Sequence, residues 1–551
     1  ARHRSHFGVG MLPFAAAVLL AAAARAVGGT AATPPRSPPP DVAVEPAVPT
    51  SPTERAVRAQ QVLSDVVGDL AEYHNTSISI AVATTKLGGV VSVAAGLNNR
   101  ATGDNLTADH RIPMGSVTKS FTACQVMQAH ERGLIDIDAP IHRYVDPVLQ
   151  RLNGTTMLRL WGGDTTILTV TAKHLMGMRS GLQDYNDSAY ATWTWAHPDG
   201  DWTPFDILHA LDKRFVCPPG MCGVYSSVGF ELLGLALVDV TNVTYWWDLD
   251  QFAAIPPALR GRYKGVAFPE RGKCSLDPQI SHQYRMVASA PGVVGDAVSV
   301  AFSDIVNYSC LNGWACGNIA ITPHDVAQWY YDLFHGNVVS NASLTTMLQG
   351  HPLTSGWDPG LRYGLGLSWY HLTGDPANLT VGVGHGGSDY GSLGHLACYN
   401  TRFDFGISIA TTSVSGMNCS REYREEYPVV PGSVYNQRYY EDDVTCRVYD
   451  AVLQVVTDGT AERLNCTGKR SDSDQRPAAA DAVTPPPPPS AECAQELEKA
   501  CGAVRSDPTV CRHCTLGATL PDCSTRQAEA YCPVPPPAPR ATPNFTCAFD
   551  W

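Results

Sequence analysis

The spacing of apolar residues predicts a helix and then a β-hairpin near the start of the main body of the chain. Over Thr53–His74, apolar residues recur every three or four positions, which places them on one side of a helix. Two β-rich runs follow at 77–82 and 90–93, and we expect the hairpin turn at Gly88 and Gly89 between them. The apolar positions of the helix are Leu63, Val66, Val67 and Leu70.

A second set of apolar segments lies far along the chain. Strand-like runs occur at 379–381, 392–398 and 405–410, and a helical pattern returns over 444–456. A helix and two strands at one end are thus matched by three strands and a helix at the other, with a long middle region between them. This order predicts an α+β domain in which both ends of the chain build one antiparallel sheet with helices beside it.

Proline-rich segments separate this domain from the rest of the chain. Residues 27–52 carry many prolines and cannot build a core, which is typical of an extended linker. A second tract, Pro485–Pro489, defines another linker at 471–490. We therefore predict one globular domain over residues 53–470.

The N-terminus and the cysteines indicate the secretory pathway. Residues 1–26 combine a basic start, an apolar run and a closing Ala24-Arg25-Ala26, as in a signal peptide; an uncleaved membrane anchor is the alternative. The 17 cysteines are many for a cytosolic protein, so we expect a secreted or membrane-anchored glycoprotein. The glycosylation triplet Asn-X-Ser/Thr recurs, for example at Asn75, Asn105, Asn153, Asn242, Asn307, Asn341, Asn378, Asn465 and Asn544.

Residues 491–551 form a cysteine-rich tail with few apolar residues, which predicts a small module held together by disulfides. Cys511, His513 and Cys514 could suggest zinc, but no second close pair of cysteines or histidines completes a tetrahedral site. We expect the tail to bind another extracellular component or to act as a spacer. We expect no metal and no other cofactor. The tail cysteines are Cys493, Cys501, Cys511, Cys514, Cys523, Cys532 and Cys547.

The charge balance argues against a nucleic-acid partner. The 551 residues include 39 Lys and Arg against 52 Asp and Glu, for a formal net charge of -13. No basic stretch stands out that could follow a phosphate backbone. With 44% hydrophobic residues, the chain can bury a large core, as an enzyme domain requires.

A serine and a lysine three positions apart are the first candidates for chemistry. The segment 111–123 is typical of a loop that runs into a helix, and it places Ser116 and Lys119 on one side of that helix. An amine near a serine can assist the loss of its proton, and a helix N-terminus stabilises a developing oxyanion. A Ser-X-X-Lys pattern alone is weak, because about one is expected by chance in a chain of this size.

The segment 111–123 resembles the nucleophile segment of the serine beta-lactamase-related hydrolases, a family that also includes penicillin-binding proteins, esterases and D-aminopeptidases. Further segments are similar to the same family in the expected order. They lie at 170–182, 219–220, 225–234, 319–333, 363–366 and 384–387. The resemblance implies a beta-lactamase/transpeptidase-like fold, which adds a mostly helical subdomain to the sheet.

The resemblance also implies roles for individual residues. Ser116 is the implied nucleophile with Lys119 as its partner, Tyr225 the implied general base, and His385 the third-motif residue where penicillin-binding proteins usually carry lysine. Tyr225 could instead be a core tyrosine. The implied substrate-binding residues are Ser227, Gly387 and Ser388, with the backbone NH groups of Ser116 and Ser388 forming the oxyanion hole.

Two positions depart from the family pattern. The second motif is usually Tyr-X-Asn, whereas its third residue here is Ser227, which has no carboxamide. Members that recognise lactams carry Thr or Ser where this chain has Gly386. Both changes weaken contacts to a beta-lactam, so we expect activity closer to that of the esterases and peptidases.

The sequence therefore predicts a secreted serine hydrolase that cleaves a small ester, amide or peptide through an acyl-Ser116 intermediate. The alternative from another class is a binding or scaffold protein that keeps the fold without turnover, since fold alone does not establish activity. Ser116, Lys119, Tyr225 and His385 together favour the enzyme.

Overall fold

The computed structural model describes residues 51–185, 193–211, 213–288, 300–355, 360–372, 375, 377–418, 437–466 and 545–547. The predicted signal segment and both predicted linkers lie outside these residues, apart from the last two residues of the first linker. The cysteine-rich tail also lies outside them, apart from one short strand. These domain predictions therefore stay predictions.

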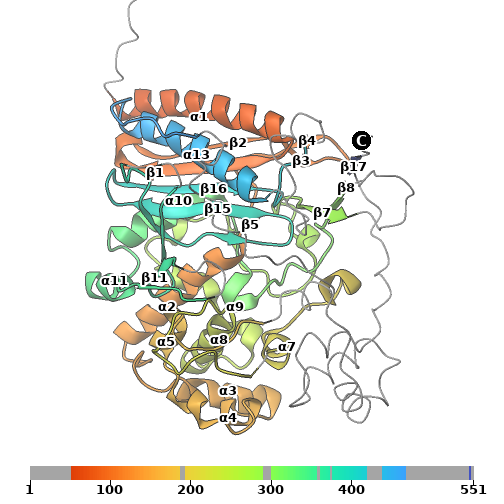
Figure 1. The fold of residues 1–551 in the computed structure, drawn as a ribbon, viewed down its shortest axis with the longest axis vertical. Helices are drawn as coiled ribbons and strands as arrows, with labels where there is room; N and C mark the ends of the chain where they lie inside the picture. The colour runs from red at the N-terminus through yellow and green to blue at the C-terminus, as the bar shows by residue number, and fades with distance from the viewer. Residues whose placement is uncertain are drawn as a thin grey trace, which may run out of the picture. The chain divides into compact units, whose positions relative to one another are not determined.

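One antiparallel sheet organises the described part of the chain. It has nine strands in the order β10-β11-β12-β13-β15-β16-β1-β2, with β14 beside β15. The predicted α+β fold with helices beside the sheet is confirmed (Figure 1). Its strands are β1 (Ile78–Thr84), β2 (Gly89–Ala95), β10 (His351–Pro352), β11 (Arg362–Tyr363), β12 (Ser368–Tyr370), β13 (Gly382–Gly384), β14 (Gly387–Ser388), β15 (Leu393–Asn400) and β16 (Phe405–Thr411).

The centre of the sheet joins the two ends of the domain, as the sequence predicts. β1 pairs with β16, where Ala83 lies opposite Gly406, and β1 also pairs with β2. The predicted hairpin is confirmed, but its turn is a 3-10 turn at Thr85–Leu87 that Gly88 closes with a φ of 73°. Gly89 already belongs to β2.

One predicted strand is displaced along the chain. The expected strand at 379–381 is wrong, because β13 begins only at Gly382. The carboxylate of Asp375 accepts hydrogen bonds from the backbone N and the hydroxyl of Thr380, at 2.6 and 2.7 Å. These bonds hold the apolar run in a turn, so the strand forms after it.

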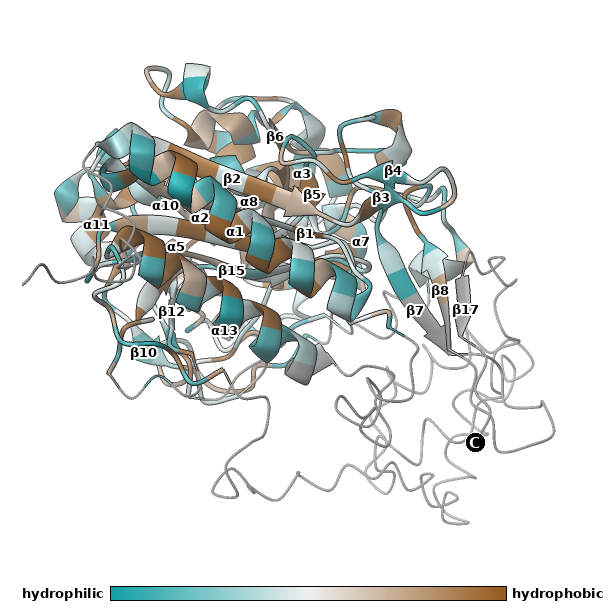
Figure 2. Ribbon diagram, turned by 90° about the horizontal axis from the view of Figure 1, so that it is seen from above, coloured by the Kyte–Doolittle hydropathy of each residue, from teal (hydrophilic) through white to brown (hydrophobic). Residues whose placement is uncertain are grey.

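Helices α1 (Pro52–His74) and α13 (Gln437–Val456) run beside each other over one side of the sheet (Figure 1). A capping box between Ser51 and Glu54 starts α1. His74 at its end lies 3.0 Å from the Asp443 carboxylate of α13, and both side chains are buried. Figure 2 shows the mixture of apolar and polar residues along α1, which is how an amphipathic helix covers a sheet.

Helix α10 (Pro323–Phe334) packs against the sheet strands β1 and β16 and links them to the helical region. The absence of a side chain at Gly406 allows this close approach, since a Cβ there would lie 2.1 Å from the Ala327 carbonyl oxygen. Trp329 and Tyr330 each donate a hydrogen bond to the Ser120 hydroxyl at 3.1 Å. These bonds fix helix α2 (Thr118–Glu131), which follows Ser116, against α10.

The middle of the chain forms the helical subdomain, seen in the lower half of Figure 1. Its centre is α8, which is buried along most of its length. The described helices of this region are α2 (Thr118–Glu131), α3 (His142–Asn153), α4 (Met157–Leu160), α5 (Ala172–Met176), α7 (Pro204–His209), α8 (Val228–Val240), α9 (Trp314–Gly317) and α11 (Asn341–Met347).

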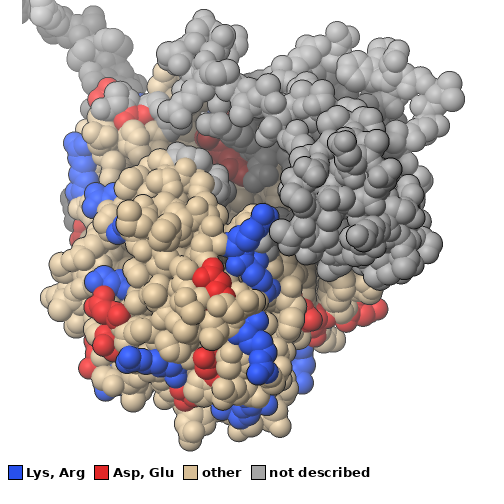
Figure 3. Space-filling model, turned by 60° about the horizontal axis from the view of Figure 1, so that its bottom comes forward, with Lys and Arg blue, Asp and Glu red and all other residues tan. Residues whose placement is uncertain are grey.

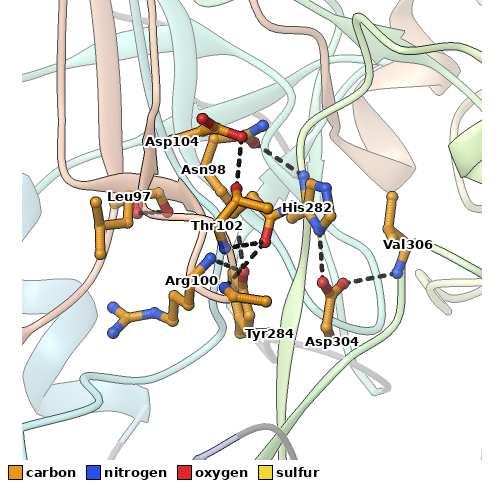
Figure 4. Close-up of polar contacts among 12 residues, drawn as sticks. Leu97, Asn98, Arg100, Thr102, Asp104, His282, Tyr284, Asp304 and Val306 are labelled. Atoms are coloured by element: carbon orange, nitrogen blue, oxygen red, sulfur yellow. Dashed lines mark hydrogen bonds and ion pairs between the residues drawn. The ribbon is translucent and has the colours of Figure 1, made fainter.

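A polar cluster fastens a smaller sheet to the main domain (Figure 4). The Tyr284 hydroxyl accepts from the Arg100 backbone N at 2.8 Å and donates to the Asn98 carbonyl at 3.1 Å. His282 lies 2.5 Å from the Asp304 carboxylate. The smaller sheets comprise β17-β8-β7 (Phe545–Cys547, Val300–Asp304, Tyr284–Ala288), β3-β4 (Leu97–Asn99, Asp104–Asn105) and β5-β9-β6 (Ile112–Pro113, Ala320–Ile321, Val266–Ala267).

The described residues contain three disulfides, between Cys217 and Cys222, Cys274 and Cys310, and Cys446 and Cys466.

On the surface shown in Figure 3, Lys and Arg side chains lie among Asp and Glu side chains. None of the helices in the described ranges has the length and apolar character needed to cross a membrane.

Candidate active site

Ser116 lies where a short 3-10 turn, Gly115–Val117, runs into helix α2. The predicted passage from loop to helix is therefore confirmed. The Thr118 hydroxyl donates to the Gly115 carbonyl oxygen at 2.7 Å and accepts from the Ile319 backbone N at 3.0 Å. These bonds fix the turn, and the helix N-terminus directs its positive potential toward Ser116.

The structure brings Lys119 and Tyr225 to the same oxygen. Lys119 Nζ lies 2.8 Å from Ser116 Oγ, and the Tyr225 hydroxyl lies 2.9 Å from it. Lys119 Nζ also donates to the Cys316 carbonyl oxygen at 3.0 Å. The Lys119 side chain is 0% exposed, and its ammonium lies 5.7 Å from the ring centroid of Phe230. Ser116 is thus held between two proton-carrying groups in a largely dry environment.

The two groups influence each other's charge. Burial alone would lower the pKa of the Lys119 ammonium, but Tyr225, Cys316 and Asp184 outweigh burial, and that pKa is raised. Burial raises the pKa of the Tyr225 hydroxyl, and Lys119 and the bond to Ser116 offset only part of this effect. Near neutral pH both groups therefore keep their protons at rest, and a base forms only when one of them loses its proton.

Two glycines let strand β14 lie directly against the nucleophile turn. A Cβ at Gly387 would lie 2.5 Å from the Ser116 backbone N and 2.3 Å from the Met114 carbonyl oxygen. Gly115 has a φ of 45°, and a Cβ there would lie 2.0 Å from the Ser388 carbonyl oxygen. The backbones that carry the NH groups of Ser116 and Ser388 are therefore neighbours, as an oxyanion hole requires.

His385 lies behind the site. Its side chain is 0% exposed, and its Nδ1 lies 2.6 Å from the Gly386 carbonyl oxygen. Its Nε2 lies 2.8 Å from the Tyr363 hydroxyl. Its ring centroid lies 6.2 Å from that of Tyr225, and no hydrogen bond joins His385 to Ser116 in the described structure. Burial, followed by the charge of Lys119, lowers the pKa of His385 to about 3, so the imidazole is neutral.

The comparisons with known proteins identify the family of this chain. A family model described as Beta-lactamase matches residues 60–425. The chain belongs to the beta-lactamase family. Penicillin-binding protein 4 of Amycolatopsis lactamdurans is 27% identical over 262 residues, which cover 43% of this chain and 59% of that protein. The chain thus spans less than two thirds of this relative's length.

Solved structures show the same family fold. D-amino acid amidase from Ochrobactrum anthropi SV3, complexed with L-phenylalanine amide, has a TM-score of 0.54 and 17% identity, and the match covers 73% of this chain and 100% of the amidase. The same amidase complexed with D-phenylalanine gives a TM-score of 0.54 and 18% identity, over 73% and 99% of the two chains. The resemblance stated from the sequence is confirmed for the family and the fold.

The second family motif contributes Tyr225 to the site, whereas Ser227 is the residue that directly precedes helix α8. Its backbone N donates to Asp184 Oδ1 at 2.9 Å, and its side chain is 7% exposed. The same oxygen of Asp184 accepts from the Tyr185 backbone N at 3.0 Å. Asp184 therefore orients the start of the helix that follows Tyr225, a role that sequence reasoning missed.

The structure gives a physical reason for the departure at Gly386 from the beta-lactamase-family pattern. A Cβ there would lie 3.1 Å from the Gly394 carbonyl oxygen and 3.2 Å from the Tyr370 hydroxyl. The Gly386 backbone N also donates to that hydroxyl. The Gly394 carbonyl and the Tyr370 hydroxyl therefore leave little room for a Thr or Ser side chain.

Three further groups near the site were assigned no role from the sequence. Tyr363 bonds to His385, and Cys316 supplies the carbonyl that holds Lys119. Asp389 follows Ser388, and its Oδ1 accepts from Asn312 Nδ2 at 2.7 Å. Burial raises the pKa of Asp389 to about 7, although Asn312 offsets part of the rise. Among the described residues, no group of three or more His, Cys, Asp or Glu side chains could hold a metal. The expectation that the site uses no cofactor stays a prediction.

The close approach at Gly387 leads to a testable expectation. We expect Gly387→Ala to lower kcat/KM for a p-nitrophenyl ester about 10-fold or more, because the new Cβ would push β14 away from the Ser116 backbone. Gly68→Ala is the control, since nothing lies within 4 Å of a Cβ there. A Gly387→Ala protein with unchanged kcat/KM would show that β14 does not shape the reacting centre.

Proposed function

We propose that this beta-lactamase-family protein is a serine hydrolase that cleaves a small ester or amide through an acyl-Ser116 intermediate. One observation carries the proposal: Lys119 Nζ and the Tyr225 hydroxyl lie 2.8 and 2.9 Å from the same Ser116 oxygen. A structural serine needs one partner, whereas a nucleophile needs groups that remove and return a proton. This contact pattern favours an enzyme over the scaffold alternative.

The proposed reaction has two halves, acylation and deacylation, and the same residues move the proton in both. Deprotonation of the Lys119 and Tyr225 pair gives the base that accepts the Ser116 proton as Oγ attacks the carbonyl carbon. The negative oxygen is stabilised by the NH groups of Ser116 and Ser388. The bond to the leaving group then breaks, and the Lys119 and Tyr225 pair gives the proton taken from Ser116 to the leaving group. Water then attacks the acyl-serine by the same route, which releases the acid and regenerates Ser116.

His385 enters this proposal as a positioning residue. Its neutral ring connects Tyr363 to the Gly386 carbonyl, and Gly386 immediately precedes the strand that carries Gly387 and Ser388. Near neutral pH the ring is uncharged and keeps a single N–H, and its two nitrogens face the Gly386 carbonyl and the Tyr363 hydroxyl and not Ser116. The catalytic role of His385 that the family resemblance implies stays a prediction, and these contacts favour support of the oxyanion strand.

The substrate preference follows from the two departures. With Ser227 and Gly386 in place of the usual amide and hydroxyl contacts, we expect small activated esters to have at least about 10-fold higher kcat/KM than a cephalosporin, a margin of about 1.4 kcal/mol. Side-by-side assays with p-nitrophenyl acetate and a chromogenic cephalosporin measure the ratio. Faster turnover of the cephalosporin would show that other residues replace these contacts.

We also propose that the protein follows the secretory pathway and carries N-glycans. Three disulfides among the described residues fit an oxidising compartment. Most of the described glycosylation triplets have an exposed asparagine, which leaves room for a glycan. Asn75 differs, because its half-buried amide donates to the Met417 carbonyl and accepts from Arg100. The exposed ones are Asn105, Asn242, Asn307, Asn341, Asn378 and Asn465.

A further inference from the structure

Helix α8 carries an acid in an otherwise apolar stretch. From Val228 to Val238, every residue except Glu231 is apolar or glycine. The Glu231 side chain is 0% exposed, and neither carboxyl oxygen has a hydrogen bond of good geometry within the described structure. Burying a carboxyl that lacks well-formed hydrogen bonds is costly, and leucine would fill the same space without that cost. The acid therefore needs an explanation other than packing.

The surroundings of Glu231 connect it to the reacting groups. Its carboxyl lies against the thiol and the backbone of Cys316, and the carbonyl oxygen of that same residue accepts the hydrogen bond from Lys119 Nζ at 3.0 Å. Phe230, the preceding residue, places its ring 5.7 Å from that ammonium. The charged and titratable groups that act on Glu231 are Cys316, Lys119 and Asp184. The described structure contains no direct ion pair between Glu231 and Lys119, so the charge of Glu231 could reach Lys119 only through space.

We propose that Glu231 is a positioning residue whose charge sets the pH at which the Lys119 and Tyr225 pair can deprotonate Ser116. The inference rests on the proposed function, since it assigns regulation to the same site. An ionised Glu231 stabilises the Lys119 ammonium and opposes a phenolate at Tyr225. Both effects hold protons on the pair. A neutral residue at 231 removes this influence, so the pair loses its proton at lower pH.

The pH dependence of acylation tests this inference. We expect Glu231→Gln to shift the rising limb of log kcat/KM for p-nitrophenyl acetate toward lower pH by about one unit, a tenfold change in proton concentration. Glu231→Asp keeps the charge and should stay near the wild-type midpoint. Glu462→Gln removes an exposed carboxylate and serves as the matched control. A folded Glu231→Gln protein whose midpoint equals that of the wild type would overturn the inference.

Thermal unfolding supplies a readout that does not depend on turnover. Burial raises the pKa of Glu231 from 4.5 to about 7, although Cys316 and Lys119 offset part of the rise. The folded state thus binds this proton more tightly than the unfolded state, so wild-type stability falls as pH rises through this range. We expect the Tm of Glu231→Gln relative to wild type to increase between pH 5 and 8. A difference that stays constant over this range would contradict the inference.

The two measurements separate this inference from the proposed function. If no pH gives wild-type labelling of Ser116 by a fluorophosphonate, the proposed hydrolase activity fails, while the Tm comparison still reports whether Glu231 titrates. If Ser116 is labelled but the pH midpoint is the same in Glu231→Gln and wild type, the hydrolase proposal stands and only the role of Glu231 is wrong.

Discussion

Ser116→Ala is expected to abolish hydrolysis of p-nitrophenyl acetate above the uncatalysed rate while the protein stays folded. The change removes the oxygen that both Lys119 Nζ and the Tyr225 hydroxyl contact, at 2.8 and 2.9 Å. The turn around it is held by other groups, since Thr118 and Ile319 form its fixing hydrogen bonds. The loss should therefore come from chemistry and not from unfolding.

The control for this variant is a serine outside the site. Ser275 is exposed and lies in a different segment, so Ser275→Ala should retain the wild-type rate. Circular dichroism and Tm measure whether both variants are folded. Ester turnover by Ser116→Ala at the wild-type rate would move the nucleophile to another residue.

Lys119→Met is expected to lower the acylation rate about 100-fold or more. Methionine keeps an apolar chain of similar length in the buried space but supplies neither the proton nor the positive charge. The loss of the ammonium also removes the charge that partly lowers the pKa of Tyr225. Formation of the base then requires a higher pH. Stopped-flow measurement of p-nitrophenol release during the first turnover gives the acylation rate directly.

Lys173→Met is the matched control for this second change. Lys173 pairs with Asp138 at 3.2 Å on the surface, and exposed pairs of this kind contribute little to stability. We expect its acylation rate to equal that of the wild type. If Lys119→Met acylates as fast as Lys173→Met, proton transfer does not depend on the buried amine.

The sequence predicted those parts of the fold that depend on local patterns. Helical spacing identified α1, and alternation of β-rich runs with glycines identified the hairpin of β1 and β2. Pairing of these strands with β16 was predictable because the same kinds of segment recur at the two ends of the domain. The strand at 379–381 was misplaced because the turn depends on Asp375, and a single carboxylate leaves no periodic signal.

The parts of the candidate site that depend on residues close together in the sequence could be predicted. The contacts that depend on tertiary packing of distant segments could not. The spacing of Ser116 and Lys119 on a helix start already placed them together, and the structure brings Tyr225 to the same oxygen. The second contact of Lys119, the carbonyl of Cys316, lies 197 residues away in the chain. Glu231 was missed because a single acid in an apolar run gives no spacing pattern, although the run itself is visible in the sequence, and its complete burial is what singles it out.

The most direct test of the central claim is covalent labelling of the wild-type protein with a fluorophosphonate, followed by mass spectrometry of its peptides. A fluorophosphonate reacts preferentially with a serine whose proton can be removed, so it reports activation without requiring the natural substrate. We predict one adduct per chain, mapped to Ser116 and absent from Ser116→Ala. Folded protein that forms no adduct, or forms it on a different residue, would contradict the assignment of Ser116 as an activated nucleophile.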